Sequence, residues 1–209
     1  KTPLIPLPSM PSAASDPAFA VWITGLPASG KSTVTAALMR ALKSRECEAV
    51  VLESDVLRRI LTPTPHYDEA ERRVFYGTMA GLGRLITAFG VPVIFDATAH
   101  RRAYREEARR QIPRFLEVWV DCPLSVCEFR DPKRIYRQAR MGLATEVPGV
   151  QVAYEPPEFP DLVIHGDVEP SDEAAMRIVT LLEERGYIPG WIPIPTFGRS
   201  LCSNEFSFL

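Results

Sequence analysis

The segment from Gly25 to Thr33 constrains this chain more than any other part of its sequence. It reads Gly-Leu-Pro-Ala-Ser-Gly-Lys-Ser-Thr, the pattern GxxxxGK[ST], with an apolar run before it and a helical pattern after it. The glycines allow a loop whose backbone N–H groups point inward, and the following helix adds the positive end of its dipole. Such a loop between a strand and a helix binds phosphate groups, although a chance match in a glycine-containing loop is the alternative.

Each polar residue of this loop has an expected role. Lys31 should reach the β- and γ-phosphates of a nucleotide, and the Ser32 hydroxyl should bind Mg²⁺. The sequence lacks both the Asn-Lys-x-Asp segment that recognises guanine and an Asp-x-x-Gly switch, so we predict ATP and Mg²⁺ as cofactors. The predicted nucleotide-binding residues are Gly25, Ser29, Gly30, Lys31, Ser32 and Thr33.

Short apolar runs alternate with amphipathic stretches along most of the chain. The runs predicted as buried strands are 20–24, 49–52, 91–95, 115–120 and 161–164. Between them apolar residues recur at helical spacing, as at Val34 and Leu38, and the last helix should have Ser171 as its N-cap and Gly186 just past its end. This alternation predicts an α/β P-loop NTPase or kinase fold, a doubly wound parallel five-stranded sheet with helices on both faces.

The length and net charge of the chain limit how many domains it can form and which partners it can bind. Its 209 residues, 46% of them hydrophobic, fit one globular domain, which we place at 19–187 between a Pro-rich tail or linker at 1–18 and a tail at 188–209. A net charge of −2 gives no indication of nucleic acid or an anionic membrane as a partner. No apolar run approaches the ~20 residues of a membrane span, and no signal peptide is visible, so we expect a cytoplasmic protein.

Cysteines and histidines show no spacing typical of a metal site. The cysteines Cys47, Cys122, Cys127 and Cys202 include no CxxC pair, and the histidines His66, His100 and His165 are scattered. We therefore expect free thiols. Only His100 lies near the presumed acceptor site, where its role as ligand, base or surface residue stays open.

A basic segment follows the fourth predicted strand. Its basic residues are Arg130, Lys133, Arg134, Arg137 and Arg140. On one helix they would lie on neighbouring turns of one side, where like charges destabilise an isolated helix unless an anion compensates. Phosphoryl transfer needs cations around the γ-phosphoryl group, so we predict a basic lid. A solvated basic face is the alternative.

Two aspartates, Asp55 and Asp96, stand at or just beyond predicted strand ends. Ligands of open parallel sheets bind at this edge, so either carboxylate could hold Mg²⁺ or accept the proton of an attacking hydroxyl. A helix N-cap is the alternative for each. We favour Asp55 as the base, because Arg58 follows one helical turn later and could hold an anionic acceptor beside it.

Four segments occur in an order that resembles one family. They are 25–33, 53–58, 120–140 and 154–162. Over roughly residues 19–187 the chain is similar to the adenylylsulfate kinases, and the lid and Tyr-Glu-Pro-Pro segments carry more of this resemblance than the phosphate loop. The resemblance implies transfer of the ATP γ-phosphoryl group to the 3′-hydroxyl of adenylylsulfate in sulfate assimilation. The family is commonly dimeric, so a homodimer is a further expectation.

Departures from the family pattern gather on the acceptor side. Glu53-Ser-Asp-Val56 stands where the family has Asp-Gly-Asp-Asn, so only Asp55 carries over. Tyr67 takes the place of a phenylalanine that stacks on the acceptor adenine. Arg72 matches a nearby arginine, but Phe75 replaces the asparagine that follows.

The remaining acceptor segments also differ. Thr98-Ala-His100 lies where the family has Ile-Ser-Pro beside the sulfate, and Val147-Pro-Gly149 falls where a second phenylalanine stacks. Asp96-Ala-Thr98, with the arginines at 101, 102 and 105, resembles other P-loop small-molecule kinases; those arginines could bind an acceptor anion or form a solvated face. We infer a rebuilt or relaxed acceptor pocket, formed by Arg58, Tyr67, Arg72, Thr98, His100 and Arg101.

These observations favour an ATP-dependent kinase that phosphorylates a hydroxyl of a small anionic acceptor, with adenylylsulfate, giving 3′-phosphoadenylylsulfate, as the first choice. A kinase for another metabolite hydroxyl or amine, and a non-catalytic nucleotide-binding module, are the alternatives. The predicted catalytic residues are Lys31, Asp55, Arg130, Lys133 and Arg137, and the predicted metal ligands are Ser32, Asp55 and Asp96. The sequence leaves open whether Asp55 or Asp96 is the base or the metal ligand.

Overall fold

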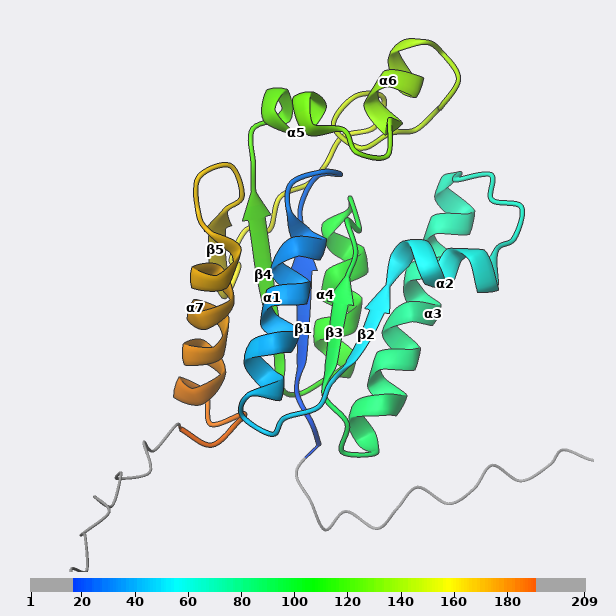
Figure 1. Cartoon of the computed structure of the whole chain (residues 1–209). Helices are drawn as coiled ribbons and strands as arrows, with labels where there is room; N and C mark the ends of the chain where they lie inside the picture. The colour runs from blue at the N-terminus through cyan, green and yellow to red at the C-terminus, as the bar shows by residue number, and fades with distance from the viewer. Residues whose placement is uncertain (1–16, 191–209) are drawn as a thin grey trace, which may run out of the picture.

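The computed structural model describes residues 17–190, and its centre is a five-stranded parallel sheet (Figure 1). The strands are β1 Ala20–Thr24, β2 Val50–Glu53, β3 Val93–Asp96, β4 Phe115–Asp121 and β5 Leu162–His165, in the order β2-β3-β1-β4-β5. The helices are α1 Lys31–Lys43, α2 Ser54–Leu61, α3 Glu69–Ala88, α4 Arg102–Gln111, α5 Leu124–Arg130, α6 Ile135–Arg140 and α7 Ser171–Glu184. All the strand pairs are parallel, as predicted.

Helices cover both faces of the sheet, which confirms the doubly wound arrangement. Every residue of β1 is buried, and its side chains alternate between the faces as the strand period requires. Val21 and Ile23 belong to the core formed with α1 and α7. Ala20 and Trp22 belong to the core formed with α3 and α4. The central position of β1 holds the phosphate loop that follows it at the carboxyl edge of the sheet.

Helix α3 lies unusually close to the sheet at Gly83. A Cβ built at this residue would lie 2.1 Å from Cζ of the Phe95 ring on β3. The two other glycines of the helix, Gly77 and Gly81, have open space at the same position. Gly83 therefore sets the distance between α3 and β3.

The start of α7 differs from the prediction. Pro170 is the N-cap residue and Ser171 is the first helical residue, without a side-chain capping hydrogen bond, so the assignment of Ser171 as N-cap is wrong. The fixed φ of Pro170, −62°, leads the chain into the helix, and Asp172 and Glu173 place negative charge in the first turn. Gly186, with φ of 64°, lies just past the helix end as predicted.

The lid, which we define as residues 124–140, is two short helices and not the single helix that the basic stripe predicted. Helix α5 ends at Arg130 and α6 begins at Ile135. Pro132 explains the break, because a proline disfavours the helical conformation of the residue before it. Asp131 and Arg134 have positive φ values of 17° and 56°, so the lid cations do not share one helical side.

The predicted tails, 1–18 and 188–209, lie almost wholly outside the described residues, and Cys202 lies outside them. The boundaries of the tails and the domain limits at 19–187 therefore stay predictions. Among the described residues, Cys47, Cys122 and Cys127 are free thiols. Within residues 17–190, no helix combines the length and apolar character needed to cross a membrane.

Gly83 provides a test of the contact between α3 and the sheet. Gly83→Ala should lower the free energy of unfolding by about 1–3 kcal/mol, because the added methyl group displaces the Phe95 ring. Gly77→Ala, in open space on the same helix, should raise it by up to about 1 kcal/mol. Chemical denaturation of both variants measures the difference, and equal effects would contradict the close approach.

Candidate active site

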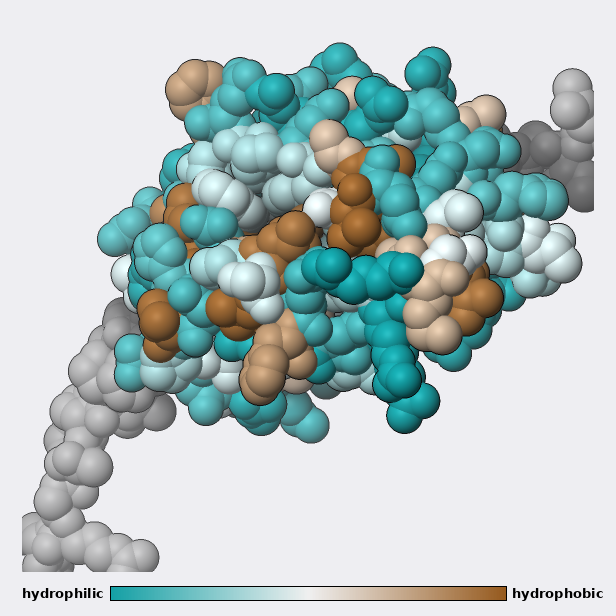
Figure 2. Space-filling model, turned by 90° about the horizontal axis from the view of Figure 1, so that it is seen from above, coloured by the Kyte–Doolittle hydropathy of each residue, from teal (hydrophilic) through white to brown (hydrophobic). Residues whose placement is uncertain are grey.

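A cavity of about 520 Å³ opens at the carboxyl ends of the strands. Its walls come from the phosphate loop, the start of α2, the end of β3, the lid and the loop after β5. Figure 2 looks down on this end of the molecule, where polar residues surround a few apolar ones. The cavity therefore lies where ligands of open parallel sheets bind.

The phosphate loop is held by close backbone packing. Gly25 has φ of 152°, and a Cβ there would lie 2.5 Å from the carbonyl oxygen of Val120 at the end of β4. Gly30, with φ of 109°, is the N-cap residue of α1. Ser29 is fully buried, and its hydroxyl has no hydrogen-bond partner among the described residues. Ser29 does not line the cavity, so the groups of this loop that are suited to bind phosphate oxygens are its backbone N–H groups at the N-terminus of α1.

Lys31 is the first residue of α1, and its ammonium group lies within the loop. The residue is only 8% exposed, and Nζ donates a hydrogen bond to the carbonyl oxygen of Leu26 at 2.8 Å. Burial lowers the pKa of Lys31, while the nearby Asp96 carboxylate acts in the opposite direction. A cation held in this way favours an incoming anion, because its charge is poorly solvated by water.

The two predicted carboxylates line the cavity in different environments. Asp96 is the last residue of β3 and is 5% exposed. It lies in register with Ile23 of β1 and Glu53 of β2. Asp55 is the second residue of α2, is exposed, and forms an ion pair with Lys133.

Two lid cations lie along the cavity. The Arg130 guanidinium donates to the carbonyl oxygens of Gly166, at 2.8 Å, and Asp167, at 3.5 Å, both in the loop after β5. Lys133 reaches across to Asp55 on α2, and this hydrogen bond raises the pKa of Lys133. The lid therefore contacts both sides of the cavity through its cations.

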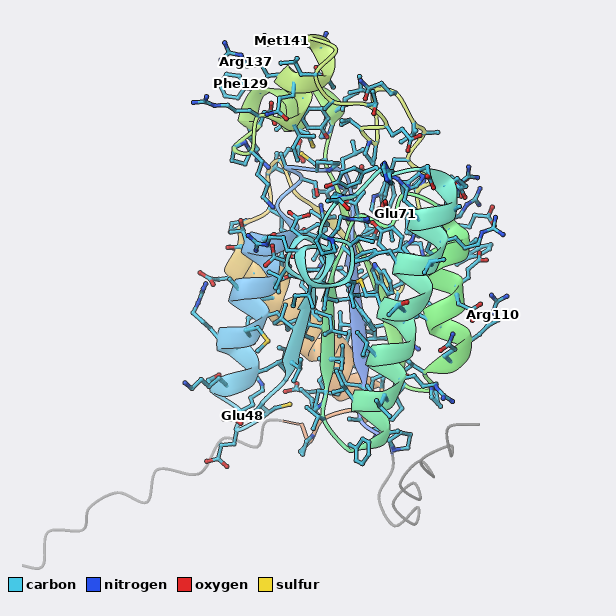
Figure 3. All side chains as sticks on the ribbon, turned by 90° about the vertical axis from the view of Figure 1, so that its right-hand side faces the viewer. Glu48, Glu71, Arg110, Phe129, Arg137 and Met141 are labelled. Carbon is cyan, nitrogen blue, oxygen red and sulfur yellow. The ribbon has the colours of Figure 1, made fainter. Side chains whose placement is uncertain are left out.

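Arg137 does not take the position predicted for a catalytic cation. It is not among the residues that line the cavity, and its side chain is exposed on the lid, at the top of the molecule in Figure 3. The turn at residues 131–134 rotates α6 relative to α5, which explains the difference. Arg140, in the same helix, forms an ion pair with Glu128 at 2.6 Å.

Arg58 and Tyr67, two predicted acceptor residues, come together beside α3. The Arg58 guanidinium lies over the Phe75 ring at 4.0 Å and over the Tyr67 ring at 4.9 Å. Its Nη1 donates to Glu71 at 2.8 Å, and Figure 3 places Glu71 at the upper end of α3, below the lid. The backbone of Tyr67 has φ of 61°, and Glu71 also accepts from its N–H. These contacts fix the orientation of both predicted residues.

Arg72 connects three segments around this cluster. Its guanidinium donates to the carbonyl oxygens of Tyr67, at 2.6 Å, and Glu146, at 2.8 Å, and it lies 3.3 Å from Nδ1 of His100. Arginine can only donate hydrogen bonds, so Nδ1 accepts and the ring proton lies on Nε2. Burial, with Arg72 next in effect, lowers the pKa of His100 to about 4. His100 is therefore neutral at physiological pH, and its ring is a weaker base than an ordinary histidine, with Nδ1 already held by Arg72.

Thr98 and Arg101, the remaining predicted acceptor residues, are separated. Thr98 lines the cavity, and its carbonyl oxygen accepts a hydrogen bond from the Thr24 hydroxyl at 2.7 Å. Arg101 is exposed and forms an ion pair with Glu69 at 2.8 Å. The position of Arg101 fits the solvated basic face and not an acceptor contact.

Sequence reasoning missed a buried ion pair that supports the acceptor side. Arg105 is 1% exposed and pairs with Glu117 of β4 at 2.6 Å. It also donates to the carbonyl oxygens of Ala99 and Glu155, which ties the loop before α4 to the Tyr-Glu-Pro-Pro segment. The signal in the sequence was Glu117 itself, because a carboxylate inside a buried strand requires a partner.

Known proteins share both the sequence and the fold of this chain. The profile of the family described as Adenylylsulphate kinase matches residues 17–165. Adenylyl-sulfate kinases of Gloeothece citriformis and Microcystis aeruginosa are 37% and 38% identical over 168 residues, which span 80% of this chain and 96% and 93% of theirs. The APS kinase CysC of Mycobacterium tuberculosis, solved with AMPPNP and APS, is 33% identical with a TM-score of 0.76, and the match covers 81% of this chain and 99% of that one.

His100 provides a pH-dependent test of the acceptor cluster. Its pKa is about 4 in the folded chain, against an ordinary value of 6.5, so the unfolded chain binds a proton first as the pH falls. The free energy of unfolding should therefore decrease between about pH 6.5 and 4, by up to about 1.4 kcal/mol per pH unit from this residue. His100→Gln should remove this part of the slope. Parallel pH profiles of the two proteins would contradict the buried neutral ring.

Proposed function

The chain belongs to the adenylylsulphate kinase family, and we propose that it transfers the γ-phosphoryl group of ATP to the 3′-hydroxyl of adenylylsulfate, giving 3′-phosphoadenylylsulfate and ADP. The observation that carries this proposal is the convergence of Lys31, Asp55, Asp96 and Lys133 on one cavity at the phosphate loop. The 33% identity to an APS kinase solved with AMPPNP and APS supports it.

The sheet order suggests how the two substrates lie. Asp55 follows β2 and Gly166 follows β5, so they stand on opposite sides of the phosphate loop, which follows β1. The acceptor cluster of Arg58, Tyr67 and Arg72 lies on the Asp55 side. We therefore place the acceptor on that side and the nucleotide base on the side of Gly166 and Arg130.

Magnesium fits the residues of the cavity. The Ser32 hydroxyl and the carboxylates of Asp55 and Asp96 are oxygen ligands of the kind that Mg²⁺ prefers, and all three residues line the cavity beside the phosphate loop. Mg²⁺ would neutralise part of the negative charge on the β- and γ-phosphates. The cation is therefore part of the proposed reaction.

Residues of the chain perform the remaining tasks. Backbone N–H groups of the loop and Lys31 hold the β- and γ-phosphates, which fixes the γ-phosphorus for attack. Asp55 accepts the proton of the acceptor hydroxyl, whose oxygen forms a bond to the γ-phosphorus while the bond to the bridging oxygen of ADP breaks. Lys133, beside Asp55, places positive charge near the transferring group and covers it from water.

A second candidate function is phosphorylation of a different anionic acceptor on the same donor site. The observation that favours it is the position of Arg58, whose guanidinium covers the Tyr67 ring at 4.9 Å. This is the ring expected to stack on the acceptor adenine. An acceptor without a purine would leave this contact intact.

The assembly and location of the protein stay predictions. A homodimer is expected from the family resemblance, and light scattering of the purified protein at micromolar concentration measures its mass directly. A cytoplasmic location, expected from the sequence, is a separate prediction that fractionation of the source cells tests.

Measurement of acceptor-dependent ADP release tests the proposed function. Adenylylsulfate should stimulate ADP release from ATP, and Lys31→Ala should reduce the rate by about 10²–10³-fold while the fold is retained. Lys43→Ala, at the exposed end of the same helix, is the matched control and should leave the rate unchanged.

A panel of other anionic hydroxyl compounds completes this experiment. Stimulation by one of them but not by adenylylsulfate would replace the first proposal with the second. Tight ATP binding without ADP release for any acceptor would identify a nucleotide-binding module.

A further inference from the structure

We propose that Tyr136 of the lid is a positioning residue for the phosphate loop. Its hydroxyl holds the carbonyl oxygen of Pro27 and thereby directs the N–H group of Ala28 toward the phosphates. This inference rests on the proposed function, because it concerns how the loop binds ATP. It gives a task to an uncharged residue of the lid.

The outer turn of the phosphate loop, residues 26–29, has a backbone conformation that narrows its type to one. Ser29 N–H donates to the Leu26 carbonyl oxygen at 3.1 Å, which closes a four-residue turn. Pro27 is the second residue and cannot adopt a positive φ, whereas Ala28, the third residue, has φ of 62°. The turn is therefore of type II.

Alanine is not the residue that this turn favours. The third position of a type II turn needs a positive φ, which glycine adopts without the Cβ penalty that alanine meets. A type I turn suits alanine, and it differs by a rotation of about 180° of the peptide group between Pro27 and Ala28. The local sequence therefore favours the other turn, so a contact from outside residues 26–29 selects the observed one.

Tyr136 supplies that contact. It is the second residue of α6 and is 1% exposed, and its hydroxyl donates to the Pro27 carbonyl oxygen at 2.9 Å. Burial raises the pKa of Tyr136, so the hydroxyl keeps the proton that it donates. In a type I turn the same carbonyl oxygen would point away from Tyr136, and the buried hydroxyl would lose its partner.

A small core under the lid holds the Tyr136 ring in place. Its buried members are Cys122, Cys127, Tyr136, Ala139 and Val147. Leu26 and Ala28 of the turn pack against them. A Cβ built at Gly149 would lie 2.9 Å from Cδ2 of Leu26, so the segment after the lid also contacts the turn closely. The lid and the turn therefore form one packed unit.

The direction of the Pro27 carbonyl group sets the direction of the next N–H group. The Pro27–Ala28 peptide is trans, so these two groups point to opposite sides. Because the carbonyl oxygen faces Tyr136, the Ala28 N–H faces away from it, and both residues of the peptide line the cavity. Among residues 17–190, no backbone carbonyl oxygen accepts from the Ala28 N–H. This group can therefore bind a phosphate oxygen.

Calorimetric titration with ATP and MgCl₂ tests the proposal without relying on catalysis. Tyr136→Phe keeps the ring and removes the hydroxyl, so the dissociation constant for ATP should rise about 3–10-fold. Tyr104→Phe is the matched control. Tyr104 is 6% exposed and donates to Glu69 at 3.1 Å, but it does not line the cavity. Its variant should keep the constant within about twofold of wild type.

Ala28→Gly separates a positioning role from a merely structural one. Glycine favours the type II turn without help, so in the Ala28→Gly background Tyr136→Phe should change the dissociation constant by less than about twofold. Equal weakening by Tyr136→Phe in both backgrounds would overturn the proposal, because a structural defect is not relieved by glycine. Thermal unfolding of each variant verifies that folded protein is titrated.

The wild-type chain is the reference for the proposed function. ATP binding by wild type with the same dissociation constant in Tyr136→Phe would refute the positioning role alone. Failure of the wild-type chain to bind ATP at millimolar concentration would refute the proposed function, and this proposal with it.

Discussion

The packing of Gly25 against the end of β4 is the contact on which the site depends. A side chain at this residue would lie 2.5 Å from the Val120 carbonyl oxygen and 2.8 Å from Ser29 Oγ, so only glycine lets the loop turn tightly over the sheet. That turn directs the loop into α1 and places Lys31 at the first helical position. The central strand thereby positions the phosphate-binding groups at the bottom of the cavity.

Charge is distributed around this loop in a way that suits two substrates. Lys31 and Asp96 are buried where the cavity meets the phosphate loop, and Asp55 and Lys133 pair at its exposed mouth. Farther out, Arg58 and Arg72 are already held by Glu71, Tyr67 and His100. The donor side is therefore built from buried groups, while the acceptor side is built from cations that the chain itself orients.

The sequence predicted best those features that depend on neighbouring residues. The loop at 25–33 and the five apolar runs are local patterns, and the structure has a strand or turn at each of them. Pro132 indicated locally that the helix of the lid ends before it. The prediction instead followed the spacing of the basic residues and assumed one helix, so it placed Arg137 on the wrong side. The stack of Arg58 on Phe75 and the pair of Arg105 with Glu117 depend on segments that only the fold brings together. No spacing in the chain specifies such partners.

A crystal structure of the chain with a non-hydrolysable ATP analogue, Mg²⁺ and adenylylsulfate tests the central claim most directly. The account predicts phosphate oxygens within hydrogen-bond distance of the backbone N–H groups of residues 28–33. It also predicts Lys31 Nζ on the β- or γ-phosphate in place of Leu26, and the acceptor hydroxyl beside Asp55. A nucleotide bound elsewhere, or a γ-phosphate directed away from Asp55, would contradict it.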